Sequence, residues 1–203
     1  MTRASIAMRG LLVMTSDEAV ASVVDAFEEF SIPYLLVGAF ATNAYCVPRA
    51  TNDADFVLAL RPGQLHQLVE RLGSNFRLDP QVLLETITLT KRHELVYLPT
   101  RFKIEFFRHT DDPHHADQFQ RRRRQFMTEL QRQVWIPTAE DVVIQKLRWQ
   151  RGKDIEDVKG VLAVSGGQLD WDYIESWAGQ HGTLELLRRI QASMPNLDDI
   201  DDV

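Results

Sequence analysis

PYLLVGAFATNAYCVPRATNDADFVLAL, residues 33–60, is the stretch from which the fold of this chain can be predicted. A short apolar run over 34–37 ends at Gly38, which is typical of a buried strand followed by a turn. The small residues that follow tolerate a helix, and Pro48 would stop it. Apolar and polar residues then alternate over residues 53–60. The stretch therefore predicts strand, turn, short helix and a second, half-buried strand.

Two carboxylates open this second strand. Asp53 and Asp55 are two residues apart, so they share one face of the strand with their Cα atoms roughly 7 Å apart. Like charges this close repel and raise each other's pKa unless a cation lies between them. A hard divalent ion such as Mg²⁺ suits two such oxygen ligands. The alternative is a polar strand end that caps a turn, which is the commoner role of an isolated Asp-x-Asp pair.

The wider pattern resembles a known family. Gly38, a short helix and the series Arg49-x-Thr51-x-Asp53-x-Asp55 are similar to the core motif of the polymerase-beta-like nucleotidyltransferase superfamily. Within it, the chain resembles the branch of AbiEii-type abortive-infection toxins and their uncharacterised bacterial relatives. Matching positions extend over roughly residues 33–164. The motifs are specific for the superfamily and much less so for one activity.

A third acid follows in the segment FKIEFFR, residues 102–108. Alternation predicts a strand on which Glu105 lies on the face opposite the apolar one. If this strand pairs with the strand over 53–60, Glu105 can complete the carboxylate site. The alternative is an exposed glutamate paired with Lys103 or Arg108. The resemblance favours the first, although similar enzymes usually carry aspartate there.

The resemblance implies an activity. A nucleoside monophosphate would pass from a nucleoside triphosphate to an acceptor hydroxyl, with Asp53, Asp55 and Glu105 as catalytic residues and as ligands of two Mg²⁺ ions. The implied acceptor is a tRNA, a protein or a small molecule, and the toxin branch implies an antitoxin partner. The implied triphosphate contacts are Gly38, Ala39, Arg49, Thr51, Lys103 and Lys146. Family members have serine where this chain has Ala39, and a non-catalytic nucleotide- or partner-binding module is the rival interpretation.

Composition indicates an ordinary globular protein. The chain has 203 residues, 44% of them hydrophobic and 26% charged, with a formal charge of −6. This balance does not favour a general nucleic-acid-binding protein. Cys46 is the only cysteine, so no internal disulfide is possible. No signal peptide or membrane span is recognisable, and we expect a cytoplasmic protein.

The expected fold class is α/β (α+β), a nucleotidyltransferase-like mixed sheet flanked by helices. We predict an N-terminal extension (1–15), a nucleotidyltransferase core (16–136), a helical C-terminal region (137–195) and an acidic tail (196–203). The four arginines of residues 121–124 are expected on a helix. A solvated helix face is the usual role of such a run, and phosphate contact is the alternative.

Overall fold

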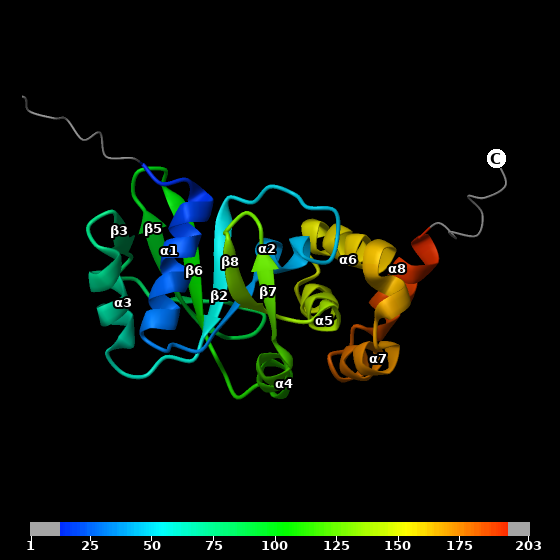
Figure 1. The fold of residues 1–203 in the computed structure, drawn as a ribbon. Helices are drawn as coiled ribbons and strands as arrows, with labels where there is room; N and C mark the ends of the chain where they lie inside the picture. Colours follow the sequence, from blue (N-terminus) through cyan, green and yellow to red (C-terminus); the bar gives the residue numbers. More distant parts are fainter. Residues whose placement is uncertain (1–12, 195–203) are drawn as a thin grey trace, which may run out of the picture.

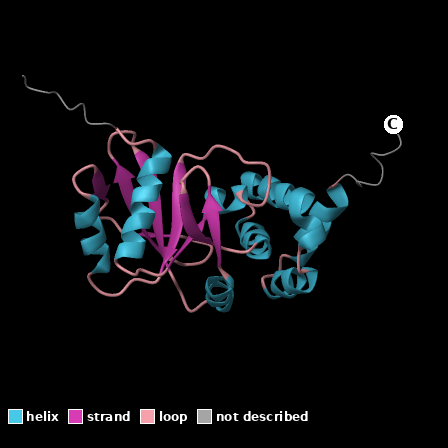
Figure 2. Cartoon of the chain, viewed as in Figure 1, coloured by secondary structure: helices cyan, strands magenta, loops and turns pink. Residues whose placement is uncertain are grey.

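A six-stranded mixed sheet forms the centre of the N-terminal part in the computed structural model, which describes residues 13–194. Its order is β1-β2-β6-β5-β3, with β4 paired to β5, and β7 and β8 form a separate two-stranded sheet. Figures 1 and 2 show the strands on one side of the molecule and α5–α8 gathered on the other. The strands are β1 (Tyr34–Val37), β2 (Asp53–Leu58), β3 (Phe76–Leu78), β4 (Leu83–Leu84), β5 (Lys91–Tyr97), β6 (Phe102–Arg108), β7 (Arg123–Met127) and β8 (Arg132–Ile136).

Helices flank the sheet and make up the C-terminal part. Those beside the sheet are α1 (Ser16–Glu29), α2 (Gly38–Asn43), α3 (Gln64–Leu72) and α4 (Pro113–Arg121). Those of the C-terminal part are α5 (Ala139–Trp149), α6 (Gly152–Ser165), α7 (Trp171–Gln180) and α8 (Leu184–Ser193), with the short 3-10 helix η1 (Gly166–Gln168). The predicted mixed sheet with flanking helices and a helical C-terminal region is confirmed. Most of the predicted N-terminal extension and the acidic tail lie outside the described residues.

The pairing of β2 with β6 is the feature that builds the site. β2 runs parallel to β6 and antiparallel to β1. In this register Asp55 lies opposite Glu105 on one side and Val37 on the other. Because side chains alternate between the two faces of a strand, Asp53, Asp55 and Glu105 all project from the same face of the sheet.

The opposite face of the sheet carries the apolar core. Phe56 and Phe106 project there, and the ring of Phe27 from α1 packs against them at centroid distances of 5.1 and 5.8 Å. All three are at most 1% exposed. The alternation read from the sequence therefore separates an apolar face, covered by α1, from a face that carries the acids.

Hydrogen bonds join the C-terminal helices to the core. The Tyr45 hydroxyl, just after α2, donates to the carbonyl of Pro137 at 2.7 Å. The Ser165 hydroxyl at the end of α6 donates to the Tyr45 carbonyl at 3.0 Å. Thr138 caps α5 by accepting from the Asp141 backbone N–H at 3.3 Å. The first two bonds connect the start of α5 and the end of α6 to the segment just after α2.

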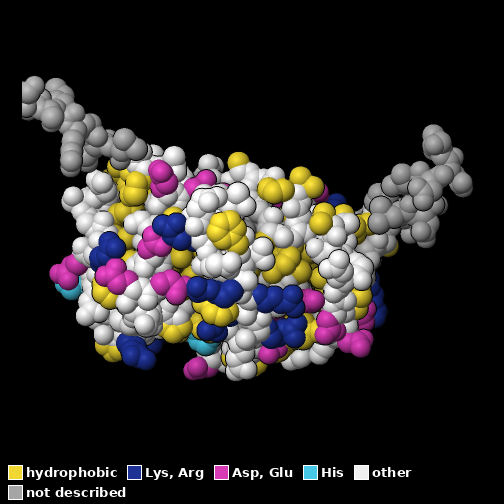
Figure 3. All heavy atoms as spheres, in the orientation of Figure 1, with side chains coloured by type: hydrophobic (Ala, Val, Ile, Leu, Met, Phe, Trp, Pro, Cys, Tyr) yellow, Lys and Arg dark blue, Asp and Glu magenta, His cyan; other side chains and the backbone are white. Residues whose placement is uncertain are grey.

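The four arginines of residues 121–124 do not lie on a single helix, contrary to the prediction from the sequence. Helix α4 ends at Arg121 and strand β7 begins at Arg123, so the predicted single helix is wrong. The guanidinium groups of Arg122 and Arg124 lie 4.9 and 5.1 Å from the ring centre of Trp135 on β8. This contact with a distant partner outweighs local helix preference. Figure 3 shows Lys and Arg side chains gathered near the middle of this face, with hydrophobic side chains between them.

Among residues 13–194, no helix has both the length and the apolar character that crossing a bilayer requires.

Candidate active site

Three carboxylates from two neighbouring strands define the candidate site. Asp53 and Asp55 lie on β2, and Glu105 lies opposite Asp55 on β6. The Thr51 hydroxyl donates to Asp53 Oδ1 at 2.8 Å, which fixes the orientation of that carboxylate. The structure thus brings together the three acids that the sequence singled out. Their carboxylates line one open hollow, together with Glu85, Thr86, Ile87, Arg92, Phe107, Trp149, Arg151 and Lys153.

Gly38 lies directly against the Asp55 carboxylate. Its φ is +64°, and a Cβ atom built on it would lie 2.2 Å from Asp55 Oδ2. Only glycine adopts this backbone conformation at little cost, and only a residue without a side chain leaves room for the carboxylate. Position 38, directly after β1, must therefore be glycine because the Asp55 side chain of β2 occupies the space where a Cβ atom would lie.

The electrostatics of the hollow are those of a cation site. Burial, followed by the charges of Asp53 and Glu105, raises the pKa of Asp55 to about 7, and Lys146 and Lys153 offset part of this effect. Burial is the largest cause of this rise, but the part that comes from the neighbouring carboxylates means that a positive charge placed among them would be bound favourably. Carboxylate oxygens are hard ligands of the kind Mg²⁺ prefers. The donor set therefore fits the ion that the resemblance implies.

Glu105 has a partner that the sequence did not reveal. Arg92 Nη1 on β5 donates to Glu105 Oε2 at 2.7 Å, and Arg92 Nε is buried without a hydrogen-bond partner among the described residues. Within residues 13–194, no three Asp, Glu, His or Cys side chains already converge as a ready-made metal site. Arg92 thus competes with any cation for Glu105. No local signal in the sequence links Arg92 to Glu105.

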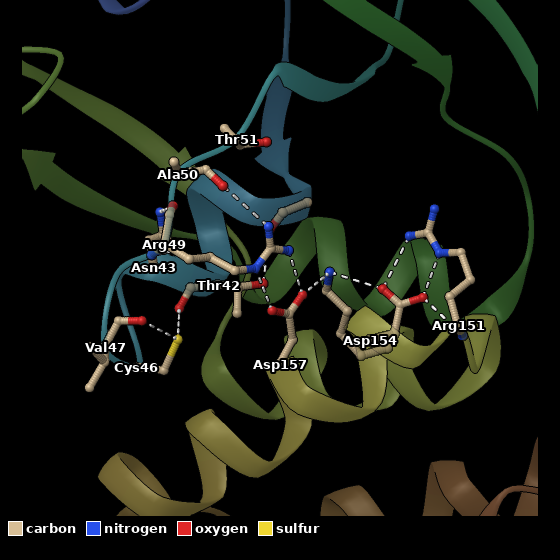
Figure 4. Close-up of polar contacts among 12 residues, drawn as sticks. Thr42, Asn43, Cys46, Val47, Arg49, Ala50, Thr51, Arg151, Asp154 and Asp157 are labelled. Atoms are coloured by element: carbon tan, nitrogen blue, oxygen red, sulfur yellow. Dashed lines mark hydrogen bonds and ion pairs between the residues drawn. The ribbon is translucent and has the colours of Figure 1, made fainter.

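Arg49 and Lys146 are engaged in a buried charge network. The Arg49 guanidinium donates from Nε and Nη2 to Asp157 at 2.8 and 2.9 Å. Lys146 Nζ lies 2.7 Å from Asp157 Oδ2 and 3.2 Å from Asp154 Oδ1, and Arg151 also binds Asp154. Figure 4 shows Arg49 reaching Asp157 across the gap between the core and α6, and Arg151 reaching Asp154. Arg49 thus links the core to α6, and Lys146 links α5 to α6.

Two further predicted contacts lie at the margin of the site. Lys103 is opposite Asp53 in the strand register, and its Nζ binds Glu94 at 2.9 Å rather than an acid of the site. Ala39 follows Gly38 in α2 and is buried at 9% exposure, with no hydroxyl to offer a ligand. Arg151 and Lys153, which line the hollow, were not predicted as site residues. Both lie at the start of α6. Tertiary packing places this start beside the hollow, and no local sequence pattern predicts that placement.

This fold and this group of carboxylates define a nucleotidyltransferase-type protein. The chain belongs to the family described as "Nucleotidyltransferase of unknown function (DUF6036)", whose model matches residues 13–194. No curated protein matches the sequence. The superfamily inferred from the motif is thus supported by the family, whereas membership of the AbiEii branch is not shown.

Solved structures show the same fold at low sequence identity. ANT(2")-Ia in complex with adenylyl-2"-tobramycin superposes with a TM-score of 0.59 at 15% identity, covering 84% of this chain and 98% of that one. The solution structure of the antibiotic-resistance factor ANT(2'')-Ia gives 0.57 at 17%, covering 85% and 96%. JHP933 from Helicobacter pylori gives 0.51 at 14%, covering 79% and 70%. At these identities the likeness concerns the fold.

Replacing Gly38 with alanine is expected to destabilise the protein and displace Asp55. Gly63→Ala is the matched control, because Gly63 also has a positive φ, +84°, in the left-handed region, but nothing lies within 4 Å of an added Cβ. The control should cost about 1 kcal/mol for the backbone conformation. Gly38→Ala should cost a further 1–3 kcal/mol or so, because the new Cβ collides with a carboxylate. Equal losses in chemical denaturation would contradict the close contact.

Proposed function

We propose that this protein is a Mg²⁺-dependent nucleotidyltransferase, which moves a nucleoside monophosphate from a nucleoside triphosphate to an acceptor hydroxyl. The observation that carries the proposal is the register of β2 and β6, which aligns Asp55 with Glu105 beside Asp53 in a hollow also lined by cations. Three carboxylates on one face are costly without a counter-ion. A bound metal–triphosphate complex would supply the positive charge that offsets the repulsion among these carboxylates.

Each group has a role in this proposal. Asp53 and Asp55 would hold Mg²⁺, and Glu105 would complete the set and take the proton of the acceptor hydroxyl. The acceptor oxygen then forms a bond to the α-phosphorus as the bond to pyrophosphate breaks. Bound Mg²⁺ supplies charge neutralisation of the phosphate oxygens. Arg151 and Lys153 line the hollow and would balance the charge of the leaving pyrophosphate.

Arg92 would change partner during this reaction. In the structure its guanidinium holds Glu105, which must be released to act as a metal ligand or a base. An incoming triphosphate offers Arg92 oxygens of stronger negative charge, and guanidinium groups bind phosphate well. We therefore expect Arg92 to pass from Glu105 to a phosphate when substrate binds.

The acceptor is the least constrained part of the proposal. The ANT(2")-Ia complex contains adenylyl-tobramycin, so a hydroxyl-bearing small molecule is one candidate class. A tRNA end or a protein hydroxyl, with a toxin-like role and an antitoxin partner, is the class suggested by the resemblance of the motif. A screen of all three classes with labelled nucleoside triphosphate, followed by mass analysis of the product, separates them.

A non-catalytic binding module is the second candidate. Two observations favour it: Ala39 lacks the hydroxyl found in similar proteins, and Glu105 is bound by Arg92. Such a module would still bind a nucleotide or a partner protein, but it would not transfer the nucleotidyl group.

Calorimetric titration tests the proposed function. ATP, CTP, GTP and UTP are titrated with and without Mg²⁺ into the wild type and into the Asp53→Asn/Asp55→Asn variant. Binding that requires both the metal and the aspartates supports the enzyme. Metal-independent binding that the variant retains supports the non-catalytic module, and no binding of any triphosphate rejects the catalytic proposal for this chain.

A further inference from the structure

One hydroxyl group lies among the acids and cations of the hollow. Thr86, in the loop between β4 and β5, lines the same cavity as the three acids of the site. Of the described residues in that lining, Thr86 alone carries a hydroxyl. The cavity measures about 320 Å³, which lies within the size range of small-ligand sites. A triphosphate bound there would therefore lie close to the Thr86 side chain.

The Thr86 hydroxyl is not engaged by the protein, whereas neighbouring hydroxyls are. Thr86 is exposed, and within residues 13–194 its hydroxyl makes no hydrogen bond. In the same loop the Thr88 and Thr90 hydroxyls lie 2.8 Å apart. Next to the acids, the Thr51 hydroxyl donates to Asp53 Oδ1 at 2.8 Å. Thr86 Oγ1 is therefore the hydroxyl oxygen at this site that is free to react.

Glu85 fixes the loop on both sides of Thr86. Its carboxylate accepts hydrogen bonds from the backbone N–H groups of Ile87 at 2.8 Å and Thr88 at 2.6 Å, and from the Thr88 hydroxyl at 2.6 Å. Burial alone would raise the pKa of Glu85, but the hydrogen bonds from Thr88 and Ile87 outweigh it and lower the pKa. Glu85 thus stays charged and is used by the loop. Thr86 lies between the two anchored positions, so its backbone is already ordered before any ligand binds.

The charges around Thr86 are those that nucleotidyl transfer needs. The hydrogen bond of Arg151 to Asp154 is the main cause that raises the Arg151 pKa. The charges of Asp55 and Asp53 raise this pKa further, so the guanidinium lies within electrostatic reach of both acids. An exposed threonine usually contacts only water, but here acids and cations line the same small cavity. A hydroxyl held in such a place reacts at a high effective concentration, because it need not be bound from solution.

We propose that Thr86 is an acceptor of the nucleotidyl group, so that the protein modifies its own β4–β5 loop. This rests on the proposed function, because it uses the same acids and the same triphosphate. Glu105 takes the proton of the Thr86 hydroxyl, Oγ1 forms a bond to the α-phosphorus, and the bond from that phosphorus to the pyrophosphate oxygen breaks. The products are pyrophosphate and a phosphodiester between Thr86 and the nucleoside. Because the attached group would occupy the hollow, we expect one addition per chain.

Mass analysis of the purified chain tests this proposal. The protein is incubated with Mg²⁺ and with ATP, CTP, GTP or UTP in turn, its intact mass is followed over time at several protein concentrations, and peptide mapping locates any added group. Thr86→Val removes the hydroxyl but keeps the shape of the side chain, and Thr86→Ser keeps the hydroxyl. Thr100→Val, in the exposed turn between β5 and β6, is the matched control. Calorimetry with Mg²⁺ compares triphosphate binding by the wild type and by Thr86→Val.

The result expected is one nucleoside monophosphate on Thr86, added at a rate that does not depend on protein concentration. Thr86→Ser and Thr100→Val should be modified, whereas Thr86→Val should bind triphosphate as the wild type does and gain no mass. Metal-dependent triphosphate binding without self-modification, or addition that persists in Thr86→Val, overturns the proposal but leaves the proposed function standing. A rate that rises with protein concentration overturns it as well, because transfer then occurs between copies, and loss of triphosphate binding in Thr86→Val would make Thr86 a triphosphate ligand instead. Failure of the wild type to bind any triphosphate rejects the proposed function itself.

Discussion

Asp55→Asn is expected to slow nucleotidyl transfer strongly and, at the same time, to make the metal-free protein more stable. Asparagine keeps the shape of the side chain against Gly38 but removes one of three neighbouring charges. Loss of a group that organises charge in the transition state typically costs about 100- to 1,000-fold in rate. Loss of the repulsion among the acids should raise the free energy of unfolding by about 1–2 kcal/mol near pH 8, since one pKa unit corresponds to about 1.4 kcal/mol.

The stability gain should depend on pH in a defined direction. The folded-state pKa of Asp55 is raised to about 7 from its usual 3.8, so between these values the folded protein binds more protons than the unfolded chain. The free energy of unfolding of the wild type therefore falls as the pH rises from about 4 to about 7. Asp55→Asn lacks this titration, so the two proteins should differ most near pH 8 and least near pH 5.

Chemical denaturation at several pH values measures this effect. Asp172→Asn, on an exposed turn of α7, is the control for a simple change of net charge. Mg²⁺ should raise the unfolding temperature of the wild type and of the control but not that of Asp55→Asn. If Asp55→Asn is less stable than the wild type at every pH, the carboxylates do not repel one another as the geometry implies.

Local sequence patterns were sufficient to assign the three candidate acids to strand faces, whereas their choice as site residues came from the resemblance. Alternation on two segments assigned Asp53, Asp55 and Glu105 to definite strand faces, and the glycine turn indicated where β1 ends. That these two strands are neighbours was only a condition that the resemblance favoured, and their parallel register, which sets Asp55 opposite Glu105, was not predicted. Strand periodicity specifies which face a side chain occupies but not which strand lies beside it.

Other features depend on contacts between distant residues, which no local pattern encodes. Arg92 reaches Glu105 only because β5 pairs with β6. His114 lies in a polar segment, yet it is fully buried and 3.2 Å from Asp141 Oδ1. The run over 121–124 was expected on one helix, but Trp135 holds two of its arginines on and beside β7. In each case the partner lies on another element.

Asp157→Ala is expected to be the most destabilising single change among the polar residues of the C-terminal helices. Asp157 is 4% exposed and accepts hydrogen bonds from both Arg49 and Lys146. Its removal leaves the buried Lys146 with one partner fewer and removes the ion-pair partner of the half-exposed Arg49, and breaking a buried pair in this way costs about 3–5 kcal/mol. Glu156→Ala is the control: Glu156 is the preceding residue, it is exposed, and among residues 13–194 its one ion-pair partner is Lys159, so its loss should cost no more than about 0.5 kcal/mol.

The same network adds an acid-sensitive contribution to stability. Burial alone would raise the pKa of Asp157, but hydrogen bonds from Arg49 and Lys146 outweigh it and hold the pKa below the usual 3.8. The stabilisation is therefore fully present above about pH 4 and is lost as the pH falls through the lowered pKa. The difference in unfolding free energy between the wild type and Asp157→Ala should narrow at strongly acid pH, whereas Glu156→Ala should show no such change.

Nucleotide binding by Asp157→Ala then decides the role of Arg49. If Arg49 is a phosphate ligand that Asp157 restrains, freeing its guanidinium should tighten triphosphate binding with Mg²⁺ even though the protein is less stable. If Arg49 serves only to join the core to α6, the variant should bind triphosphate no better than the wild type does. Because Lys146 keeps Asp154 as a partner, its own charge stays compensated in the variant. A gain in affinity therefore belongs to Arg49, and its absence assigns the motif arginine to the architecture of the site.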